Sequence, residues 1–485
     1  MRADRSASYL LGAGFARKER TAMVRGTLGE HAVVIGAGVA GLASAGALRD
    51  RFERVTVLEL DAFPPTAAHR NGTPQDRHTH GVLCGGLQAL EEVFPGFAGD
   101  LERAGAVPLR VGYDLRYERP GFDAFPKRDF GWLAYGMSRP MIERVLRARV
   151  EQCANVTLRG RSRVREIVAT PDGAAANGVA FEQDGRGQTL AADLVVEATG
   201  RGDLTVALLE ALHGALPHET SLGVDLGYST AVFEMPDDAP CDWKGVLCFP
   251  KAPQSSRFGI LWPIEGHCWT VSLAGRFDDK PPGDPDGFMA FARSLRTPTI
   301  ADALESAKFV SPVSRFGTRT CVRRDFSNLA GFPQGLIPLG DAICRFNPTY
   351  GQGMSVAAQQ ARLLRRLLDG AVAGSRGLAG VAPAFFVQAQ TLLDAPWSMT
   401  TALDLAYPQT EGDRPADLEQ RRRFGLALLQ LAVSDPAVHK LTLAVQHLLE
   451  PQSVYGEPAL VERVRAVIQK MPGATETRAL SSTRA

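Results

Sequence analysis

The sequence lacks long apolar runs and an excess of charge of either sign. No stretch of about 18 or more consecutive apolar residues occurs in the 485 residues, which argues against a transmembrane span. Lys and Arg number 54 against 53 Asp and Glu, so the charge balance favours neither nucleic acid nor an anionic membrane as the main partner. The length allows about two to four domain-sized units with a large buried core.

Cysteine is scarce, and its pattern excludes two kinds of site. The seven cysteines are odd in number and form no CxxC pair, so neither a disulfide framework nor a zinc site is expected. His78 and His80 form an HxH pair, but no third ligand stands at a suitable spacing. We therefore predict no metal site, and free thiols in a reducing cytoplasm.

The two ends of the sequence carry no pattern typical of a folded element. The first residues lack the apolar run and the small-residue cleavage site of a signal peptide. Residues 1–29 are predicted to be a mobile extension, within which Met1 and Met23 are alternative start sites. Residues 471–485 are predicted to be a disordered tail.

A glycine-rich motif predicts a nucleotide-binding turn. The apolar run HAVVI runs directly into residues 36–41, GAGVAG, and a helical pattern then continues through residue 48. The next apolar run, RVTVLE, ends at Glu59. This order of strand, glycine turn, helix, strand and acid is that of a dinucleotide-binding fold. The alternative is a glycine turn that only packs a helix against a strand.

Each position of this motif has a physical role in the nucleotide interpretation. Gly36 allows the tight turn, Gly38 lets the backbone approach a pyrophosphate, and Gly41 lets the helix pack close to the strand. Val39 and Ala40 begin the helix whose free N–H groups face the phosphates. Glu59 accepts hydrogen bonds from ribose hydroxyls. A single copy of the motif fits either a tightly held FAD or an NAD-dependent dehydrogenase.

A second half-site is predicted about three hundred residues further along the chain. The apolar run GLIPLGD ends at Gly340 and Asp341, and a turn rich in proline and glycine follows. A helical pattern then runs from Met354 to Leu368. Strand, glycine turn and helix N-terminus again indicate an anion- or dipole-binding site, here without the GxGxxG spacing. Its candidate contacts are Gly340, Asp341, Pro348, Gly351, Gly353 and Met354.

Between the half-sites lie a polar loop, a helix and strand-like segments. The loop after Glu59 carries Arg77, whose guanidinium would pair with a phosphate or form a surface salt bridge. Residues 138–150 predict a helix capped by Ser138. Residues 155–196 predict a β-meander, and ILWPIEGHCWTVSL predicts a hairpin turning at Glu265-Gly266. Its tryptophans would line an apolar pocket or pack in a core.

Four motifs resemble one enzyme family. They are AFP followed by RNGTPQDRHTHG, DLVVEATGRGD, GDAICRFNPTYGQGMS and WSMTTALDLAYPQT. The chain resembles, from about residue 31 to 450, the single-Rossmann flavin-dependent monooxygenases, the group that includes para-hydroxybenzoate hydroxylase and squalene epoxidase. The greatest likeness is to the epoxidases of polyether pathways. The chain departs from the wider family at residues 198–200, where ATG stands in place of a DG motif.

The resemblance implies a set of cofactor contacts. Asp341 would bind the FAD ribitol, and the backbone of residues 351–354 would lie near the N1/O2 edge of the flavin. Arg77 and Arg139 would contact FAD, and Val164 would lie near the adenine.

The expected fold is α/β, with a Rossmann-like FAD-binding domain, an inserted antiparallel β-sheet substrate domain and a helical C-terminal region. The predicted boundaries are 30–220 and 311–375 for the FAD-binding domain, 221–310 for the sheet domain and 376–470 for the helical region.

The expected function is that of an FAD-dependent monooxygenase acting through a flavin C4a-hydroperoxide. It would epoxidise or hydroxylate a hydrophobic small molecule with O2, in secondary metabolism and in the cytoplasm. NADPH or NADH would supply electrons, directly or through a separate reductase. The sequence offers no outstanding side-chain base, which favours an alkene or polyene over a phenol. The alternatives are a non-redox flavoprotein cyclase and a catalytically silent binding protein. The halogenase motif WxWxIP is absent from the sequence.

Overall fold

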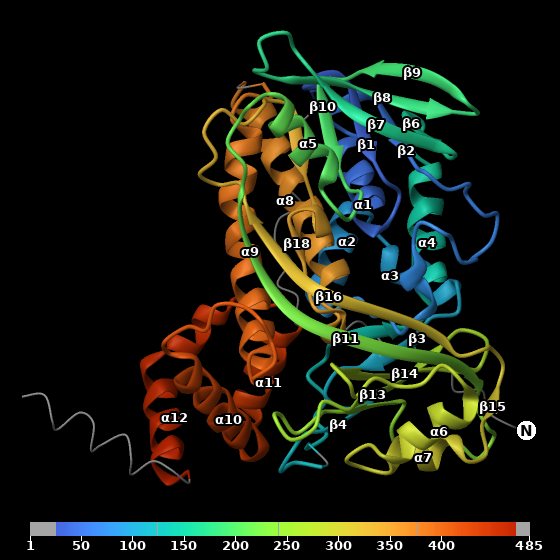
Figure 1. Cartoon of the computed structure of the whole chain (residues 1–485), viewed down its shortest axis with the longest axis vertical. Coiled ribbons are helices and arrows are strands. Elements are labelled where there is room, and N and C mark those ends of the chain that lie inside the picture. Colours follow the sequence, from blue (N-terminus) through green and yellow to red (C-terminus); the bar gives the residue numbers. More distant parts are fainter. Residues whose placement is uncertain (1–25, 124, 241, 376, 472–485) are drawn as a thin grey trace, which may run out of the picture.

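The computed structural model describes residues 26–123, 125–240, 242–375 and 377–471 (Figure 1). The predicted tail after residue 471 and all but the last four residues of the predicted N-terminal extension lie outside this range. The described chain forms an upper part built on a parallel sheet, a lower part built on an antiparallel sheet, and a group of C-terminal helices. This arrangement confirms the expected α/β fold class.

A five-stranded parallel sheet carries the glycine-rich motif. Its strand order is β17 (Leu336–Pro338), β10 (Leu194–Glu197), β1 (Gly29–Ile35), β2 (Phe52–Leu58) and β6 (Val156–Arg159), with every neighbouring pair parallel. The central strands are continuous apolar runs because helices and the meander cover both faces. Parallel pairing brings the carboxyl ends of these strands to one edge of the sheet.

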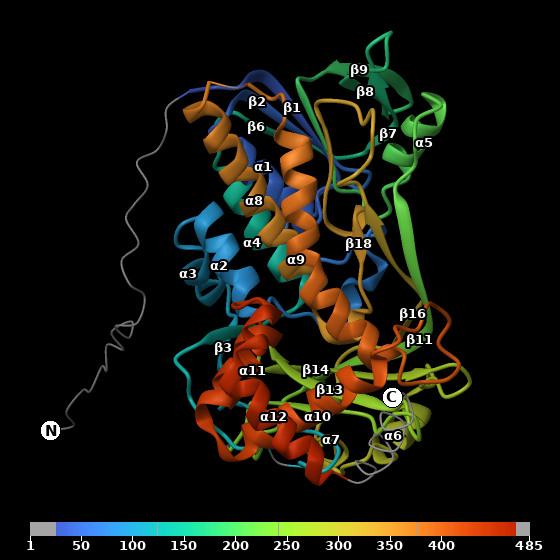
Figure 2. The same ribbon diagram turned by 90° about the vertical axis from the view of Figure 1, so that its left-hand side faces the viewer.

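Helices from distant parts of the sequence pack around the first turn. Helix α1 (Val39–Leu48) is buried on nearly every side, which explains its run of Ala, Gly, Val and Leu. It packs against α4 (Arg139–Glu151) and α8 (Gly353–Ala373), and α8 in turn lies beside α2 (Cys84–Val93) and α9 (Val381–Asp404) (Figure 2). Ser138 caps α4 as predicted, because its Oγ accepts a hydrogen bond from the Met141 N–H at 3.3 Å.

Two smaller sheets and two short helices belong to the first half of the chain. The predicted meander forms an antiparallel sheet of β7 (Ser162–Ala169), β8 (Ala176–Gln183) and β9 (Arg186–Ala191). The chain then returns to the parallel sheet at β10 and continues into α5 (Asp203–Ala211). The other small sheet pairs β3 (Val107–Arg110) with β5 (Leu133–Gly136), and α3 (Phe97–Arg103) precedes it.

The lower sheet is antiparallel except at one edge. Its strands are, in order, β18 (Cys344–Arg345), β16 (Ser314–Asp325), β11 (His218–Glu234), β14 (Cys268–Arg276), β13 (Phe258–Ile264), β12 (Gly245–Cys248) and β4 (Leu115–Glu118), with β15 (Lys308–Phe309) paired to β11. The β12–β4 pair is parallel. The long strands β11 and β16 run between the upper and lower parts (Figure 1), and the predicted boundaries near residues 220 and 311 fall close to them.

The predicted hairpin is confirmed, and its two tryptophans take different places. The turn between β13 and β14 contains Gly266 and His267, both with positive φ. Trp269 is 2% exposed and belongs to a core with α6 (Pro285–Arg293) and α7 (Thr299–Leu304). Trp262 instead lines the large cavity described below. The core interpretation is therefore correct for Trp269, and the pocket-lining interpretation is correct for Trp262.

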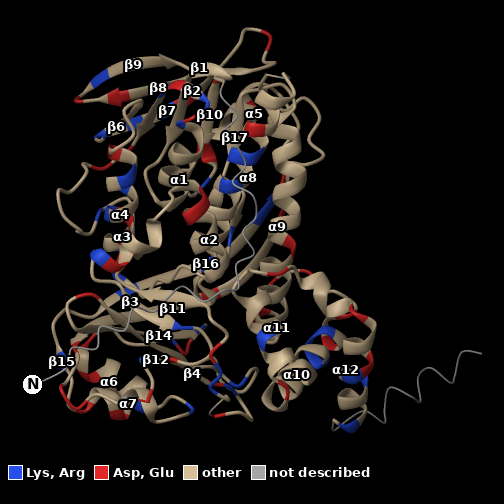
Figure 3. Cartoon of the chain, turned by 180° about the vertical axis from the view of Figure 1, so that it is seen from behind, with Lys and Arg blue, Asp and Glu red and all other residues tan. Residues whose placement is uncertain are grey.

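The C-terminal region is helical, as expected. After α9 come α10 (Leu418–Ser434), α11 (Pro436–Gln446) and α12 (Pro458–Lys470). Asp435 caps α11, since its Oδ1 accepts from the N–H groups of Ala437 and Val438. Among the described helices, none is both long enough and apolar enough to cross a membrane. Basic and acidic residues are interspersed along the described elements (Figure 3).

The packing of α1 on β1 gives a testable consequence. A Cβ at Gly41 would lie 1.9 Å from the Gly36 carbonyl oxygen, whereas a Cβ at Gly38 would meet nothing nearer than Arg139 Nη2 at 3.8 Å. We expect Gly41→Ala to lower the free energy of unfolding of the flavin-free protein by about 1–3 kcal/mol, because backbone has to move. Gly38→Ala is the matched control and should change it by less than about 1 kcal/mol. Equal stabilities in denaturant titrations would contradict this packing.

Candidate cofactor and substrate site

One large cavity joins the two predicted half-sites to the antiparallel sheet. Its volume is about 1340 Å³, above the roughly 300–1,000 Å³ typical of small-molecule pockets. It begins at the carboxyl edge of the parallel sheet, passes between β11–β14 and the start of α8, and ends against β4, β12 and the C-terminal helices. The space is therefore large enough for an extended ligand together with a second, smaller molecule.

Most of the predicted contacts line this cavity. The lining residues among them are Gly36, Gly38, Val39, Ala40, Glu59, Arg139, Val164, Asp341, Pro348, Gly351, Gly353 and Met354. Gly41 and Gly340 lie behind the lining, where they allow close packing. Arg77 is exposed and lies outside the lining.

Gly36 and Gly38 have different roles in the first motif. Gly36 has φ of 99°, and a Cβ there would lie 2.6 Å from the Ala198 carbonyl oxygen, so this turn accepts only glycine. Gly38 leaves its backbone open toward the cavity. No side chain caps the N-terminus of α1, so its first N–H groups are available to an anion.

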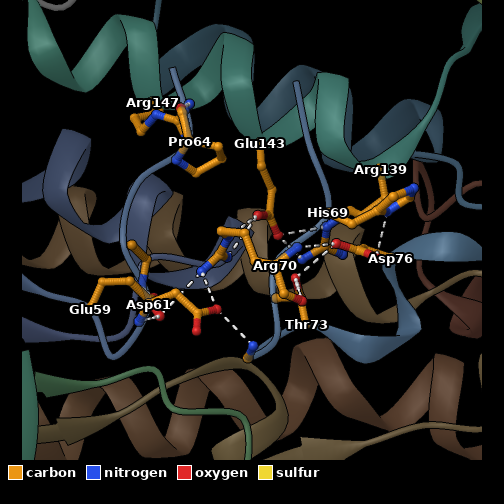
Figure 4. Close-up of polar contacts among 12 residues, drawn as sticks. Glu59, Asp61, Pro64, His69, Arg70, Thr73, Asp76, Arg139, Glu143 and Arg147 are labelled. Atoms are coloured by element: carbon orange, nitrogen blue, oxygen red, sulfur yellow. Dashed lines mark hydrogen bonds and ion pairs between the residues drawn. The ribbon is translucent and has the colours of Figure 1, made fainter. Parts of the chain in front are cut away.

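Glu59 lies at this turn and is already held in place. Its Oε2 accepts from the Ala37 N–H at 2.7 Å, and its Oε1 accepts from the Asp61 N–H at 3.0 Å. The side chain of Arg70 approaches the same Oε1 at 3.1 Å (Figure 4). The carboxylate is thus fixed between the glycine turn and the following loop, at the wall of the cavity.

Arg70, rather than Arg77, is the arginine that this loop buries at the site. Its guanidinium donates to Glu143 Oε2 at 2.7 and 3.1 Å and lies 3.6 Å from Asp61 (Figure 4). Glu143 also accepts from Arg139 Nε at 2.9 Å. Burial alone would raise the pKa of Glu143, but Arg139 and Arg70 outweigh it and hold that pKa below its ordinary value.

The two histidines of the same loop are neutral structural groups. His78 shares a hydrogen bond with Thr230 Oγ1 at 2.7 Å, and His80 Nδ1 lies 2.8 Å from the His78 carbonyl oxygen. Burial lowers the pKa of His78 to about 3 and that of His80 to about 4. In the described ranges, no group of three His, Cys, Asp or Glu residues is arranged to hold a metal ion.

The second half-site meets the first across α1. Gly340 has φ of 70°, and a Cβ there would lie 2.9 Å from the Ala40 Cβ, so glycine is needed for this approach. The next residue, Asp341, faces the cavity and accepts no hydrogen bond from any described residue. The protein that surrounds its carboxyl group raises its pKa to about 6. Helix α8 begins beside it, again without a side-chain cap.

A buried cluster that the sequence did not reveal holds the turn between Asp341 and α8. Asp404, on α9, is fully buried, and its Oδ1 accepts from Asn347 Nδ2 and the Tyr350 hydroxyl, each at 2.9 Å, and from Arg276 Nη2 at 2.5 Å. Burial raises the pKa of Asp404 despite these partners. The sequence signal was present, because Asp404 lies in the quoted motif WSMTTALDLAYPQT.

The departure from the family pattern at residues 198–200 has a local structural effect. The Thr199 hydroxyl donates to Glu197 Oε1 at 2.8 Å. Glu197 is fully buried and accepts from the N–H groups of Leu204 and Thr205 at the start of α5. Thr199 and Gly200 line the cavity. Glu197 therefore holds the start of α5, and Thr199 supports Glu197 from the cavity wall.

Several aromatic rings line the far end of the cavity together with aliphatic side chains, and we call this end the aromatic chamber. Its rings are Tyr117, Phe249, Phe258, Trp262, Phe424 and Tyr455. They come from β4, β12–β13 and the C-terminal region, so residues far apart in the sequence build it. His267, at the hairpin turn, is exposed and does not line the cavity.

Comparisons with known proteins relate this geometry to one family. The family described as FAD binding domain matches residues 30–381. Protein Rv3254 of Mycobacterium tuberculosis is 34% identical over 370 residues, which are 72% of this chain and 75% of that protein.

Two solved structures share the fold at low sequence identity. The flavin-dependent brominase Bmp2 has a TM-score of 0.66 at 14% identity, covering 91% of this chain and 98% of that one. The p-nitrophenol 4-monooxygenase PnpA of Pseudomonas putida has a TM-score of 0.62 at 16% identity, covering 88% and 99%.

The Asp404 cluster yields the first site prediction. Arg276→Met removes the buried cation and leaves Asp404 without its countercharge, so we expect a loss of about 3–5 kcal/mol in the free energy of unfolding. The control is Arg421→Met at the cavity rim, where the pair with Asp417 is about half exposed. That loss should stay below about 1 kcal/mol. Similar losses in the two variants, measured by denaturant titration, would refute a stabilising role for the buried pair.

Asp341 yields a pH-dependent prediction for the flavin-free protein. Its folded pKa of about 6 exceeds its ordinary value of 3.8, so its contribution to stability is complete below pH 3.8 and is lost as the pH rises through 6. We expect Asp341→Asn to be more stable than wild type at pH 7, with the advantage shrinking toward pH 4. Water in the cavity screens the carboxylate, so the gain should be smaller than the about 3 kcal/mol that the full shift implies.

Although Asp341→Asn should gain stability without FAD, it should lose affinity for FAD if Asp341 holds the ribitol. Loss of one charged hydrogen bond should then weaken FAD binding by about one to two decades. Denaturation between pH 4 and 7, with FAD titration in parallel, measures both effects. A variant that is less stable at pH 7 would show that Asp341 instead supports the turn.

Proposed function

Because the chain belongs to the FAD binding domain family, we propose that it is an FAD-dependent monooxygenase that transfers one atom of O2 to an apolar small molecule. The observation that carries this proposal is the single cavity, which joins two helix N-termini to the aromatic chamber. One end suits a dinucleotide, and the other suits an apolar substrate. Family membership supports flavin-dependent oxygenase chemistry.

The residues at the parallel-sheet end fit FAD. The uncapped N-terminus of α1 and the open backbone at Gly38 would hold the diphosphate, and Glu59 would hold the adenosine ribose. Val164 would lie near the adenine. Arg139 would contact the cofactor from α4, and Asp341 would bind the ribitol. The backbone of residues 351–354 would lie along the pyrimidine edge of the flavin, where the N-terminus of α8 favours negative charge. For a contact with the diphosphate, the exposed position of Arg77 is less suitable than that of Arg139.

The protein's own contribution is to position the substrate and exclude water. Bound FAD supplies the oxygen-transfer chemistry, and the aromatic chamber supplies an apolar surface beside it. Two titratable side chains of the chamber, His447 and Tyr117, are uncharged at neutral pH and are therefore poor proton acceptors. Burial lowers the pKa of His447 to about 4 and raises that of Tyr117 to about 12. This supports epoxidation of an alkene or polyene over base-assisted hydroxylation of a phenol.

The finer parts of the proposal come from the resemblance of the motifs. We propose NADPH or NADH as electron donor, directly or through a reductase, and a role in secondary metabolism in the cytoplasm. A relationship to polyether-pathway and squalene-type epoxidases is part of the same proposal. The domain boundaries at residues 220, 310 and 375 likewise remain proposals.

Isotope labelling tests the proposed reaction. Purified holoenzyme is expected to release FAD on denaturation and, with NADPH and labelled O2, to place one labelled oxygen atom in the product and the other in water. Candidate polyenes and aromatic substrates are compared by mass spectrometry. His267→Ala is the control for a side-chain base and should change turnover less than about tenfold, or 1.4 kcal/mol. Product formed without oxygen consumption would indicate a non-redox flavoprotein and overturn the proposal.

A further inference from the structure

Arg119 stands at the wall of the aromatic chamber without a countercharge. It directly follows β4, and its guanidinium carbon lies 4.2 Å from the ring centre of Phe249 and 5.6 Å from that of Tyr117. Its one side-chain hydrogen bond among the described residues goes to Gln446 Oε1 on α11, at a long 3.4 Å. In the described part of the chain, no carboxylate lies within 4 Å of it.

The other enclosed arginines of the cavity are paired. Arg70 and Arg139 share Glu143, and Arg276 is paired with Asp404. At the rim, Arg421 and Arg422 meet Asp417 and Glu419. An arginine enclosed by protein normally has a carboxylate partner, because an unpaired charge in a poorly solvated place is costly. Arg119 lacks one, so a counter-anion from a ligand would fill an otherwise unmet need.

The geometry leaves the donor groups of Arg119 available. Its guanidinium lies over the faces of aromatic rings, which support the cation through their π electrons. A stacked guanidinium keeps its N–H groups at the edge of its plane, in the fork arrangement that matches a carboxylate. Burial lowers the pKa of Arg119 to about 10, still well above neutrality, so the side chain remains a cation at pH 7.

We propose that Arg119 binds an anionic group of the substrate, so that the substrate is an apolar molecule carrying a carboxylate or a similar single anion. This rests on the proposed function, since it assigns the chamber to the substrate. The aromatic walls would hold the apolar body, and Arg119 would fix one end of it. The substrate's orientation, and hence the carbon nearest the flavin, would follow from this contact.

Most of the other basic side chains of the cavity are already neutralised, so they do not compete with Arg119 for an anion. Its described lining holds three acidic residues and eight basic ones, namely Arg70, Arg119, Arg139, Arg163, Lys251, Arg276, Arg421 and Arg422. Glu143, Asp404 and Glu419 lie outside this lining and pair with Arg70, Arg139, Arg276 and Arg422. Arg119 lies among the aromatic rings, away from the glycine turn that would hold the diphosphate.

Matched acid and alcohol probes test the proposal on the holoenzyme. Octanoate, decanoate and dodecanoate are titrated against the corresponding alcohols, following the flavin absorbance and the tryptophan fluorescence, to which Trp262 in the chamber wall contributes. We expect the acids to bind at least about tenfold more tightly than the alcohols. Arg119→Met and Arg119→Gln should abolish this preference while leaving alcohol binding within about twofold, and Arg119→Lys should retain part of it.

The matched control is Arg110→Met. Arg110 also stacks on a ring, that of Tyr113 at 4.1 Å, but it is half exposed, lies outside the cavity lining and is paired with Asp114. This variant should keep the full preference for acids. FAD content is measured first in every variant and should equal that of wild type.

Three outcomes would overturn the proposal. The first is equal affinity for acids and alcohols, or binding of neither, in the wild type, which needs no variant to fold. The second is a preference that survives in Arg119→Met and Arg119→Gln. The third is an Arg119 effect on NADPH binding alone, which would assign the anion to the electron donor. Failure of oxygen transfer with the acid preference intact would instead refute the proposed function.

Discussion

The site depends on the parallel pairing of four strands. Because β1 pairs in parallel with β2 and β10, and β10 with β17, the chain leaves all four strands at the same edge of the sheet. The glycine turn, Glu59, the segment after β10 and Asp341 are thereby gathered from about three hundred residues of sequence. At two of these strand ends the neighbouring segments lie so close together that only glycine fits. A side chain at Gly36 would collide with Ala198, and one at Gly340 would collide with Ala40.

The elements that sequence reasoning predicted well are those fixed by neighbouring residues. The glycine turn, the Ser138 cap and the hairpin turn each depend on side chains within a few positions, and each is found where it was predicted. Arg77 shows the limit of this reasoning. The loop holds two arginines, and local sequence gave no reason to prefer Arg70. The choice depends on Glu143, which is 73 residues away and completes the buried network.

The C-terminal region illustrates a second limit, because its helices were expected to cover the sheet domain or the substrate entrance, but the residues through which they contact the site were not predicted. Asp404 on α9 reaches back to the turn that precedes α8 and joins it to Arg276 on the antiparallel sheet. Nothing in the periodicity of a helix indicates which distant turn its single buried acid will hold. The aromatic chamber has the same origin. Trp262 on β13 was a candidate for a pocket wall, but nothing in the sequence indicated that β4 and α10 would contribute rings beside it.

The two ends of the cavity differ in how the charges of their arginines are compensated. At the sheet end, the buried arginines are held by carboxylates whose own positions are fixed, so the wall is rigid before any ligand arrives. At the chamber end, aromatic rings replace carboxylates as the neighbours of the Arg119 cation. Rings stabilise a guanidinium without neutralising it, and therefore leave its attraction for an anion in place. A carboxylate introduced at the Phe249 position, whose ring centre lies 4.2 Å from the Arg119 guanidinium carbon, would satisfy Arg119 internally and remove that attraction. The aromatic composition of this wall is thus what keeps the chamber selective for charge as well as for apolar surface.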